Sequence, residues 1–541
     1  MDNPSKEKGE MKIKNSFIIA ICLITLFTAI FQPLTSKVLG KPDPVSDALD
    51  YLRSVQQPDG CIENYATSSW ATMAIAAAGE DPHTWAPAGV SIVDYLKNNT
   101  DLLDLNKPSD IARFILSMTA AGENPYDING TDYVALLKGH FNNGQIGETY
   151  YLFDDFWGVI ALVSAGEPVN STIIQQSLSF IQENQNPDGG WSWGVGYDSD
   201  VDDTAAAIMA LISAGRPESS ICIRKARNYL KQNQQPDGGF PSWGETNSGS
   251  DSWGISGIVA MNEDPAEWTV DGNSVIDHLL SLQNPDGSFN WSTYNPPWVN
   301  KPLLTSYAIV ALCYRQYPVN GFTVYLRIEG SSRTIWRRRT FVSASIIIDD
   351  ASNEHLFLKP TALGALDTAA EIGGFNYKVQ ETAWGLYLYS VAGEDAAGMS
   401  GWLYRVDYVM PWVGADNFVL NETSPPSPPH REVLFYYGEW TALPIKLIVN
   451  ATKVQIGNAL RVQTLYYNDT SASWEPLENA TVFFMGLTYL TDSSGSLTVT
   501  VFCSSWIRVE KQGFVRSDRI WITALGIAEN SLGGKSGIFP I

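Results

Sequence analysis

Helical patterns of two kinds alternate along the first half of the chain. One kind places apolar residues on one face and polar residues on the other, as in residues 174–184 and 223–233. The other kind is apolar on nearly every side, as in residues 157–165 and 205–214. An amphipathic helix buries a single stripe, whereas a helix that is apolar all round is buried completely. The alternation therefore predicts an outer layer of amphipathic helices around an inner layer of apolar ones.

A recurring turn separates these helices. The motif Gln/Asn-Pro-Asp-Gly occurs at residues 57–60, 186–189, 235–238 and 284–287, and the last three copies begin 49 residues apart. Pro ends the preceding helix, and Gly supplies the positive φ of the turn. With the weaker units near Val90 and Tyr133, the chain holds six helix pairs. Because no pair can bury its apolar face alone, the repeats predict an α6/α6 toroid over residues 43–316.

The repeat resembles those of known families. Gln-x-Pro-Asp-Gly-Gly-Trp/Phe after an amphipathic helix is similar to the repeats of prenyltransferases, of squalene and terpene cyclases, and of the barrel of transcobalamin and intrinsic factor. The resemblance implies the toroid, which hosts several unrelated activities.

The second half of the chain alternates with a period of two, which is typical of strands. Residues 320–440, with the strand Gly401-Trp402-Leu403-Tyr404, resemble the small α+β domain of transcobalamin-like proteins. A Pro-rich segment, residues 424–429, replaces the short acidic turn usual there. Residues 443–526 resemble an immunoglobulin-like or carboxypeptidase-regulatory-like β-sandwich, and 527–541 form a tail. The predicted fold class is multidomain: an all-α α6/α6 toroid, a small α+β domain and a β-sandwich.

The N-terminus is typical of an exported protein. Four lysines precede an apolar run at residues 17–31, so residues 1–42 are expected to be a signal peptide or an N-terminal membrane anchor. Asn-x-Ser/Thr sequons, the acceptors for N-glycosylation, support a secreted or cell-surface glycoprotein. They start at Asn98, Asn129, Asn170, Asn290, Asn421, Asn450, Asn468 and Asn479.

Composition excludes several classes of function. A formal charge of −23 offers no electrostatic footprint for nucleic acid. The cysteines beyond the N-terminal segment form no CxxC knuckle, and the five histidines show no ligand spacing, which argues against a zinc site. No Gly-x-Ser-x-Gly elbow or P-loop is present.

An acidic string carries the sharpest catalytic candidate. Asp200-Val201-Asp202-Asp203-Thr204-Ala205 resembles the Asp-x-Asp-Asp-Thr-Ala string of class II terpene cyclases. In that family the middle acid, here Asp202, protonates an alkene, and Asp200 and Asp203 would assist because one carboxylate disfavours ionisation of the next. The chemistry needs a protonated acid in a dry, aromatic-lined cavity. Those cyclases place the acid between two helical barrels, whereas a single barrel is predicted here.

Two further interpretations of the acidic string remain open. Aligning the repeats on their closing Gly places Asp203 level with Asp154, Asp110 and Thr67, so an oxygen-bearing residue recurs there and is expected to be a helix N-cap. Alternatively, the D-x-D-x-D spacing suits Ca2+ ligation. That site would consist of Asp198, Asp200 and Asp202. The adjacent pair Asp154-Asp155 also admits a glycosidase interpretation, which the capping role disfavours.

Aromatic residues after the turns suggest ligand binding. Trp191, Phe240 and Phe289 are expected to anchor their own turns. Trp193, Trp243 and Trp291 are not needed for that purpose and should line one rim of the toroid. Together with Trp402 and Tyr404 they are the expected ligand-binding residues.

We therefore expect an exported surface protein that holds a ligand between the toroid and the transcobalamin-like domain. The ligand would be a corrinoid such as cobalamin, as the transcobalamin resemblance implies, or an isoprenoid or glycan. One alternative is a class II terpene cyclase with Asp202, Asp200 and Asp203 as catalytic residues. Another is a structural or adhesion protein without a ligand.

Overall fold

The computed structural model describes residues 43–420 and 432–526. The predicted signal or anchor, the tail, the Pro-rich segment and the sequon at Asn421 lie outside these ranges. Within them, none of the helices combines the length and the apolar character needed to cross a bilayer.

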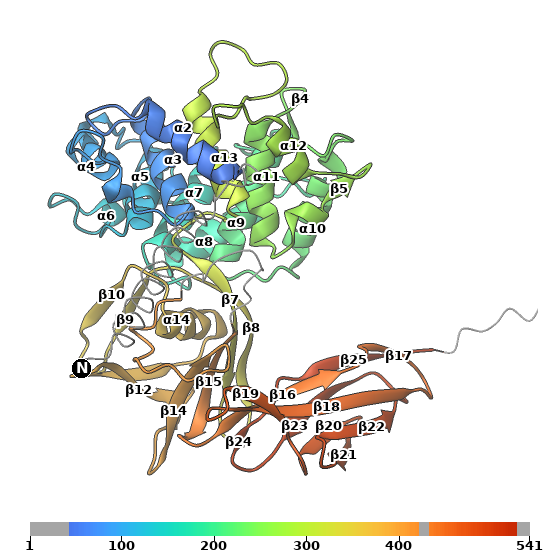
Figure 1. The fold of residues 1–541 in the computed structure, drawn as a ribbon. Helices are drawn as coiled ribbons and strands as arrows, with labels where there is room; N and C mark the ends of the chain where they lie inside the picture. The colour runs from blue at the N-terminus through green and yellow to red at the C-terminus, as the bar shows by residue number, and fades with distance from the viewer. Residues whose placement is uncertain (1–42, 421–431, 527–541) are drawn as a thin grey trace, which may run out of the picture.

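Six buried helices form a closed ring, the inner layer of the helical region (Figure 1). Each contacts the next in chain order, and the last contacts the first. They are α3 (Tyr65–Ala77), α5 (Pro108–Ala121), α7 (Leu152–Ser164), α9 (Val201–Ser213), α11 (Ser248–Ala260) and α13 (Lys301–Leu312). Because these helices are apolar on almost every side, they are stable only when surrounded by others.

Six amphipathic helices pack outside the ring, each against one inner helix. They are α2 (Pro44–Val55), α4 (Ile92–Asn98), α6 (Tyr133–Lys138), α8 (Thr172–Glu183), α10 (Ile221–Asn233) and α12 (Val275–Ser281). Short strand pairs lie in the connecting loops: β1 (Phe141–Asn142) with β2 (Gln145–Ile146), β3 (Pro241–Ser242) with β4 (Glu245–Thr246), and β5 (Thr269–Val270) with β6 (Asn273–Ser274).

The turns are attached to the inner helices by a repeated hydrogen bond. In five inner helices, the side chain of the fourth residue, or of the fifth in α13, accepts a hydrogen bond from a backbone N–H of the preceding turn. The donor–acceptor pairs are Ile62–Ser68 (2.9 Å), Ile146–Asp155 (2.9 Å), Trp191–Thr204 (2.9 Å), Phe240–Asp251 (2.7 Å) and Phe289–Thr305 (3.1 Å). The side chains of Trp191, Phe240 and Phe289 are fully buried, as an anchoring role requires.

The predicted helix caps were wrong by three residues. Thr67, Asp110, Asp154 and Asp203 are each the third residue of an inner helix, and the N-caps are Asn64, Lys107, Tyr151 and Asp200. The alignment of the repeats holds, but each helix begins one turn earlier than its apolar run.

A mixed sheet with one helix follows the ring. Its strand order is β14 (Ser400–Val406), β15 (Glu432–Glu439), β7 (Phe322–Glu329) and β8 (Thr334–Val342). Helix α14 (Ala362–Gly373) packs on this sheet, and the two share one apolar core. In smaller sheets, β9 (Ser345–Ile348) pairs with β10 (Glu354–Phe357), and β12 (Gly385–Val391) lies between β11 (Tyr377–Thr382) and β13 (Glu394–Asp395).

Two five-stranded sheets form the C-terminal region and enclose a third apolar core. One contains β16 (Leu443–Val449), β18 (Ala459–Asn468), β19 (Ser473–Pro476), β22 (Ser496–Thr500) and β24 (Phe514–Val515). The other contains β17 (Lys453–Gln455), β20 (Thr481–Phe484), β21 (Leu487–Leu490), β23 (Ser505–Glu510) and β25 (Ile520–Leu525). A helical fold followed by a β-rich region is therefore confirmed.

The middle region is attached to the C-terminal ends of the inner helices. Ser343 Oγ donates a hydrogen bond to the Val163 carbonyl at 2.7 Å, and Asn320 Nδ2 donates to the Ser164 carbonyl at 2.9 Å. Arg338 Nη2 donates to the Gly215 carbonyl, just beyond α9, at 2.6 Å. The N-terminal ends of the inner helices, where the acidic string lies, therefore face away from the β regions.

Candidate functional site

Aromatic rings from alternate helices meet inside the ring of helices. Trp70 of α3, Trp157 of α7 and Trp253 of α11 lie with ring centroids 5.3 to 5.6 Å apart in all three pairs. Because these helices are not neighbours in the ring, their side chains can meet only near its axis. Tyr307 of α13 joins them, 5.2 Å from Trp70 and 4.8 Å from Trp253. We call these four residues, with Tyr317, the aromatic layer.

One side of the aromatic layer is sealed. Tyr317 follows α13 and lies 5.4 Å from Trp70 and from Trp253, with 1% of its surface exposed. Its backbone N–H donates to the Met209 sulfur, which belongs to the C-terminal half of α9. By contrast, Trp157, Trp253 and Tyr307 remain half-buried. The layer is thus closed toward the β regions and keeps accessible surface within the ring.

Asp202 lies on the inner side of the ring, one turn of helix above the aromatic layer. It is the second residue of α9, four residues before Ala206, which is equivalent to the Trp positions of the other helices. Four residues of helix rise about 6 Å. Burial raises the pKa of Tyr307, the Arg113 guanidinium lowers it, and the Asp202 carboxylate raises it. Since residues four apart share one face of a helix, Asp202 lies on the same face of α9 as Ala206, toward the ring interior.

Burial favours the protonated form of the Asp202 carboxyl. Desolvation by burial raises its pKa to about 7, with a further contribution from Asp200, while Ser250 lowers it. Its Oδ1 atom is buried and has no hydrogen-bond partner. Removal of a carboxyl from water disfavours the charged form, so the proton is retained well above the usual range.

Asp200 and Asp203 have different roles from Asp202. Asp200 is the N-cap of α9, with Oδ1 accepting from the Asp203 N–H at 2.8 Å. Burial raises the pKa of both carboxyls, and for Asp203 the Asp200 charge is the next cause. Asp203 is therefore a buried acid beside the cap rather than the cap itself.

The exposed tryptophans lie at the same end of the ring as the acidic string. Trp193 is 37% exposed, and its ring lies 4.4 Å from that of Tyr197. Trp243 is almost fully exposed before α11, and half-buried Trp291 lies 6.4 Å from Trp298 before α13. The three loops precede α9, α11 and α13, as the prediction of a shared rim requires.

Trp402 and Tyr404 do not join these residues. Both lie on β14, where buried Trp402 donates to the Glu394 carbonyl at 2.8 Å and Tyr404 donates to the Val413 carbonyl at 2.7 Å. Their region contacts the opposite end of the ring from Trp193. The predicted combination of all five aromatics in one site was therefore wrong, because the repeat does not specify the end of the ring that the next region contacts.

The contact between the ring and the middle region leaves little space for a ligand. A cavity of about 10 Å3 lies there, lined by residues that include Ser213, Ser345, Asp367 and Glu371. A volume of this size holds about one water molecule. A corrinoid does not fit between these surfaces as they are packed.

The structure does not bring the predicted calcium ligands together. Within the described residues, three metal-ligating side chains converge at Asp349, His355 and Glu381 and not in the acidic string. Asp200 turns to the helix terminus, whereas Asp202 turns inward. The oxygens of buried Asp349 are already used, because they accept hydrogen bonds from Ala351, Asn353 and His355.

The pair considered for a glycosidase, Asp154 and Asp155, has a structural position. Asp155 anchors a turn, and Asp154 is buried, with 3% of its surface exposed.

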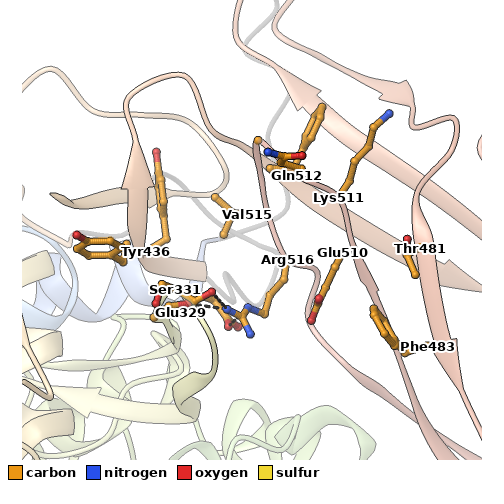
Figure 2. Close-up of a pocket in the computed structure, with 14 residues that line it drawn as sticks. Glu329, Ser331, Tyr436, Thr481, Phe483, Glu510, Lys511, Gln512, Val515 and Arg516 are labelled. Carbon is orange, nitrogen blue, oxygen red and sulfur yellow. Dashed lines mark hydrogen bonds and ion pairs between the residues drawn. The ribbon is translucent and has the colours of Figure 1, made fainter. Parts of the chain in front are cut away.

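A cavity of about 410 Å3 lies away from the acidic string, between the middle and C-terminal regions (Figure 2). Its charged residues are paired: Arg516 Nε contacts Glu329 at 3.1 Å, and Arg516 Nη2 donates to the Ser331 carbonyl at 2.9 Å. Lys511 donates to the Glu478 carbonyl at 2.6 Å. Because Arg516 joins the two regions and Lys511 is bonded within the C-terminal region, we place the candidate site in the ring.

Sequence reasoning missed the residues inside the ring. Trp70, Arg113, Trp157 and Trp253 are each the sixth residue of an inner helix. The signal in the sequence is a large side chain that recurs at this position when the repeats are aligned.

Comparisons with known proteins identify the type of ring. The family model described as the squalene-hopene cyclase C-terminal domain matches residues 159–326. The predicted resemblance to squalene cyclases is therefore confirmed over that range, which includes the acidic string. The match agrees with the enzymatic alternative, a class II terpene cyclase. No curated protein matches the chain significantly.

Three solved structures are similar at low identity. A type II terpene cyclase, MstE from Scytonema, is 13% identical over 50% of this chain and 97% of its own (TM-score 0.39). An ent-copalyl diphosphate synthase from Streptomyces platensis is 17% identical over 46% of this chain and 50% of its own (TM-score 0.34). Haptocorrin in complex with Cbi is 12% identical over 72% of this chain and 96% of its own (TM-score 0.33). The immunoglobulin-like module stays a prediction.

Proposed function

We propose that this protein is a cyclase of the class II terpene type, in which Asp202 protonates a carbon–carbon double bond of a linear isoprenoid. The observation that carries the proposal is the position of a buried carboxyl, with a raised pKa, inside the ring and above an aromatic layer. The family match supports it, because residues 159–326 contain all three acids of the string.

The reaction would begin with proton transfer. The electron pair of the terminal double bond forms a new C–H bond with the Asp202 proton, which leaves a carboxylate on Asp202 and a cation on the neighbouring carbon. The next double bond attacks that cation and closes a ring. Loss of a proton from the product cation restores the charge balance, and Asp202 regains its proton.

The aromatic layer suits this chemistry. The faces of Trp and Tyr rings attract cations through their quadrupoles. Half-buried Trp157, Trp253 and Tyr307 would offer such faces below Asp202. Water is a competing nucleophile for a cation, so sealing of the ring by Tyr317 would protect the intermediate.

The remaining features complete the proposal. The twelve helices would form an α6/α6 toroid, and the C-terminal sheets an immunoglobulin-like β-sandwich that acts as a spacer. Export by residues 1–42 would place the enzyme at the cell surface, where its substrate would be a membrane-derived isoprenoid.

Product analysis tests the proposal. The purified full chain is incubated with geranylgeraniol or squalene, and products are examined by mass spectrometry. Asp202→Asn should abolish cyclised product and leave the circular dichroism spectrum unchanged, because the amide keeps its size but cannot donate an acidic proton. Asp198→Asn, at an exposed position outside the helix, is the matched control and should retain activity. Cyclisation that persists in Asp202→Asn, or its absence in folded wild type, would overturn the proposal.

A further inference from the structure

Arg113 occupies the position in α5 that Trp70, Trp157 and Trp253 occupy in their helices. Its guanidinium lowers the pKa of Tyr307, which lies on α13. Because Trp70, Trp157 and Trp253 meet inside the ring from this same position, the Arg113 side chain extends inward, toward the aromatic layer. A charged, hydrogen-bonding group therefore lies beside a set of apolar rings.

The hydrogen-bonding capacity of Arg113 is only partly used. Its Nη2 donates to Asp110 Oδ1 at 2.7 Å, and its side chain is 18% exposed. Its Nε–H is buried and has no partner. A guanidinium has five N–H donors and no acceptor, and a buried donor without a partner is costly. The charge of Arg113 is balanced by Asp110, so the missing partner is a neutral oxygen rather than a second anion.

Tyr317 supplies a second unpartnered donor in the same interior. Its hydroxyl is buried among the rings of the aromatic layer and makes no hydrogen bond, although the residue is 1% exposed. A hydrocarbon ligand would leave both donors without an acceptor. A ligand oxygen would satisfy at least one of them.

We infer that the ring recognises an isoprenoid bearing a neutral oxygen, such as a ketone or alcohol, and that the Arg113 Nε–H donates a hydrogen bond to that oxygen. This inference rests on the proposed function and specifies its substrate class. Arg113 is a positioning residue: it holds the oxygenated part of the chain so that a double bond lies near Asp202. Sites built to donate hydrogen bonds reject analogues that lack the acceptor.

A matched set of ligands tests the inference. Farnesylacetone carries a ketone, its methylene analogue replaces that oxygen with CH2, and farnesylacetic acid carries a carboxylate. Calorimetric titration of the full chain should show about tenfold tighter binding of the ketone than of the methylene analogue. The acid should bind no better than the ketone, because Arg113 is already paired with Asp110.

Two variants keep the test independent of folding. Arg113→Lys keeps the charge beside Asp110 but lacks Nε, so it should lose the preference for the ketone and still bind the methylene analogue. Arg224→Met, on the exposed face of α10, is the control and should keep the preference. Equal binding of ketone and methylene analogue by wild type would overturn this inference, and the cyclase proposal would stand if Asp202-dependent product still formed. Absence of both binding and product for every isoprenoid would overturn both.

Discussion

The Asp203 backbone N–H donates a hydrogen bond to Asp200 Oδ1 at 2.8 Å, which fixes the first turn of α9. Asp202 lies between the two residues and takes no part in this bond. Successive side chains on a helix point in different directions, so the turn that directs Asp200 to the helix terminus directs Asp202 into the ring. One short string thus provides both a structural cap and a free acid.

The cap gives the first prediction. Asp200→Ala should lower the free energy of unfolding by about 1 kcal/mol, because the Asp203 N–H loses its acceptor. Asp200→Asn keeps a side-chain oxygen and should cost much less. Urea denaturation followed by helical circular dichroism measures both. Equal losses in the two variants would show that the charge of Asp200, and not its capping bond, stabilises α9.

The pH dependence of cyclisation gives the second prediction. The pKa of Asp202 is about 7, and the protonated form is the one that can donate a proton. The rate should therefore be highest below pH 7 and fall as the pH rises through that value. Single-turnover rates between pH 5 and 9 measure the profile. An increase in rate through the same range would assign Asp202 the role of a base.

Local features of the ring could be predicted from the sequence, whereas its interior could not. The Pro-Asp-Gly turns identify where helices end, and full burial of Trp191 follows from its place after such a turn. The meeting of Trp70 with Trp157 depends on which helices alternate around the closed ring. Trp70 and Trp157 are 87 residues apart in the sequence, so no local sequence pattern predicts their contact.

The repeated turn anchor gives the third prediction. Thr305 Oγ1 accepts from the Phe289 N–H at 3.1 Å, and Thr305 is fully buried. Thr305→Val keeps the shape but leaves that N–H unpaired, which should cost about 1–3 kcal/mol. Thr305→Ser keeps the hydroxyl and should cost less. Thermal melting, followed by the helical circular dichroism signal, compares the two variants. Equal melting temperatures for Thr305→Val and Thr305→Ser would show that the hydrogen bond adds no stability.

A charge pair between a buried arginine of the middle region and a partly exposed aspartate of the C-terminal region gives the fourth prediction. Arg405, whose side chain is fully buried, donates to Asp469 at 2.7 Å and 2.8 Å. Asp469→Asn leaves the guanidinium without its counter-charge and should destabilise the folded chain by about 1–3 kcal/mol, less than for a fully buried pair because the Asp469 side chain is partly exposed. The double variant Arg405→Met, Asp469→Asn removes that charge and should recover part of the loss. A single variant as stable as wild type would show that other groups compensate the Arg405 charge.

The docking of the β regions could not be predicted for a related reason. Asp469 lies in an Asn/Asp-rich turn that is typical of exposed hairpins, and it remains partly exposed. Its partner Arg405 is distant in sequence and has no recognisable motif. Glu371 also contacts a residue that is distant in sequence: its carboxylate accepts a hydrogen bond from the Val169 N–H of the ring at 2.9 Å.

Buried acids at the contact between the ring and the middle region give the last prediction. Burial raises the pKa of Asp367 to about 7, while the Tyr377 hydroxyl lowers it. Burial raises the pKa of Glu371 to about 8, with Asp367 and Glu167 adding to the shift and the Val169 N–H opposing it. Both groups therefore bind protons more tightly in the folded chain than in the unfolded one.

The sign of the effect on stability follows from these shifts. Their stabilising contribution is complete below about pH 4, where both states are protonated, and is lost as the pH rises through 7 to 8. For each extra proton that the folded state binds, the free energy of unfolding falls by about 1.4 kcal/mol per pH unit within that window. The variant Asp367→Asn, Glu371→Gln keeps the oxygens that accept from Tyr377 and Val169 but cannot ionise. Its melting temperature should therefore fall less steeply than that of wild type between pH 5 and 8. Parallel curves for the two proteins would show that these carboxyls do not control the pH dependence of the contact.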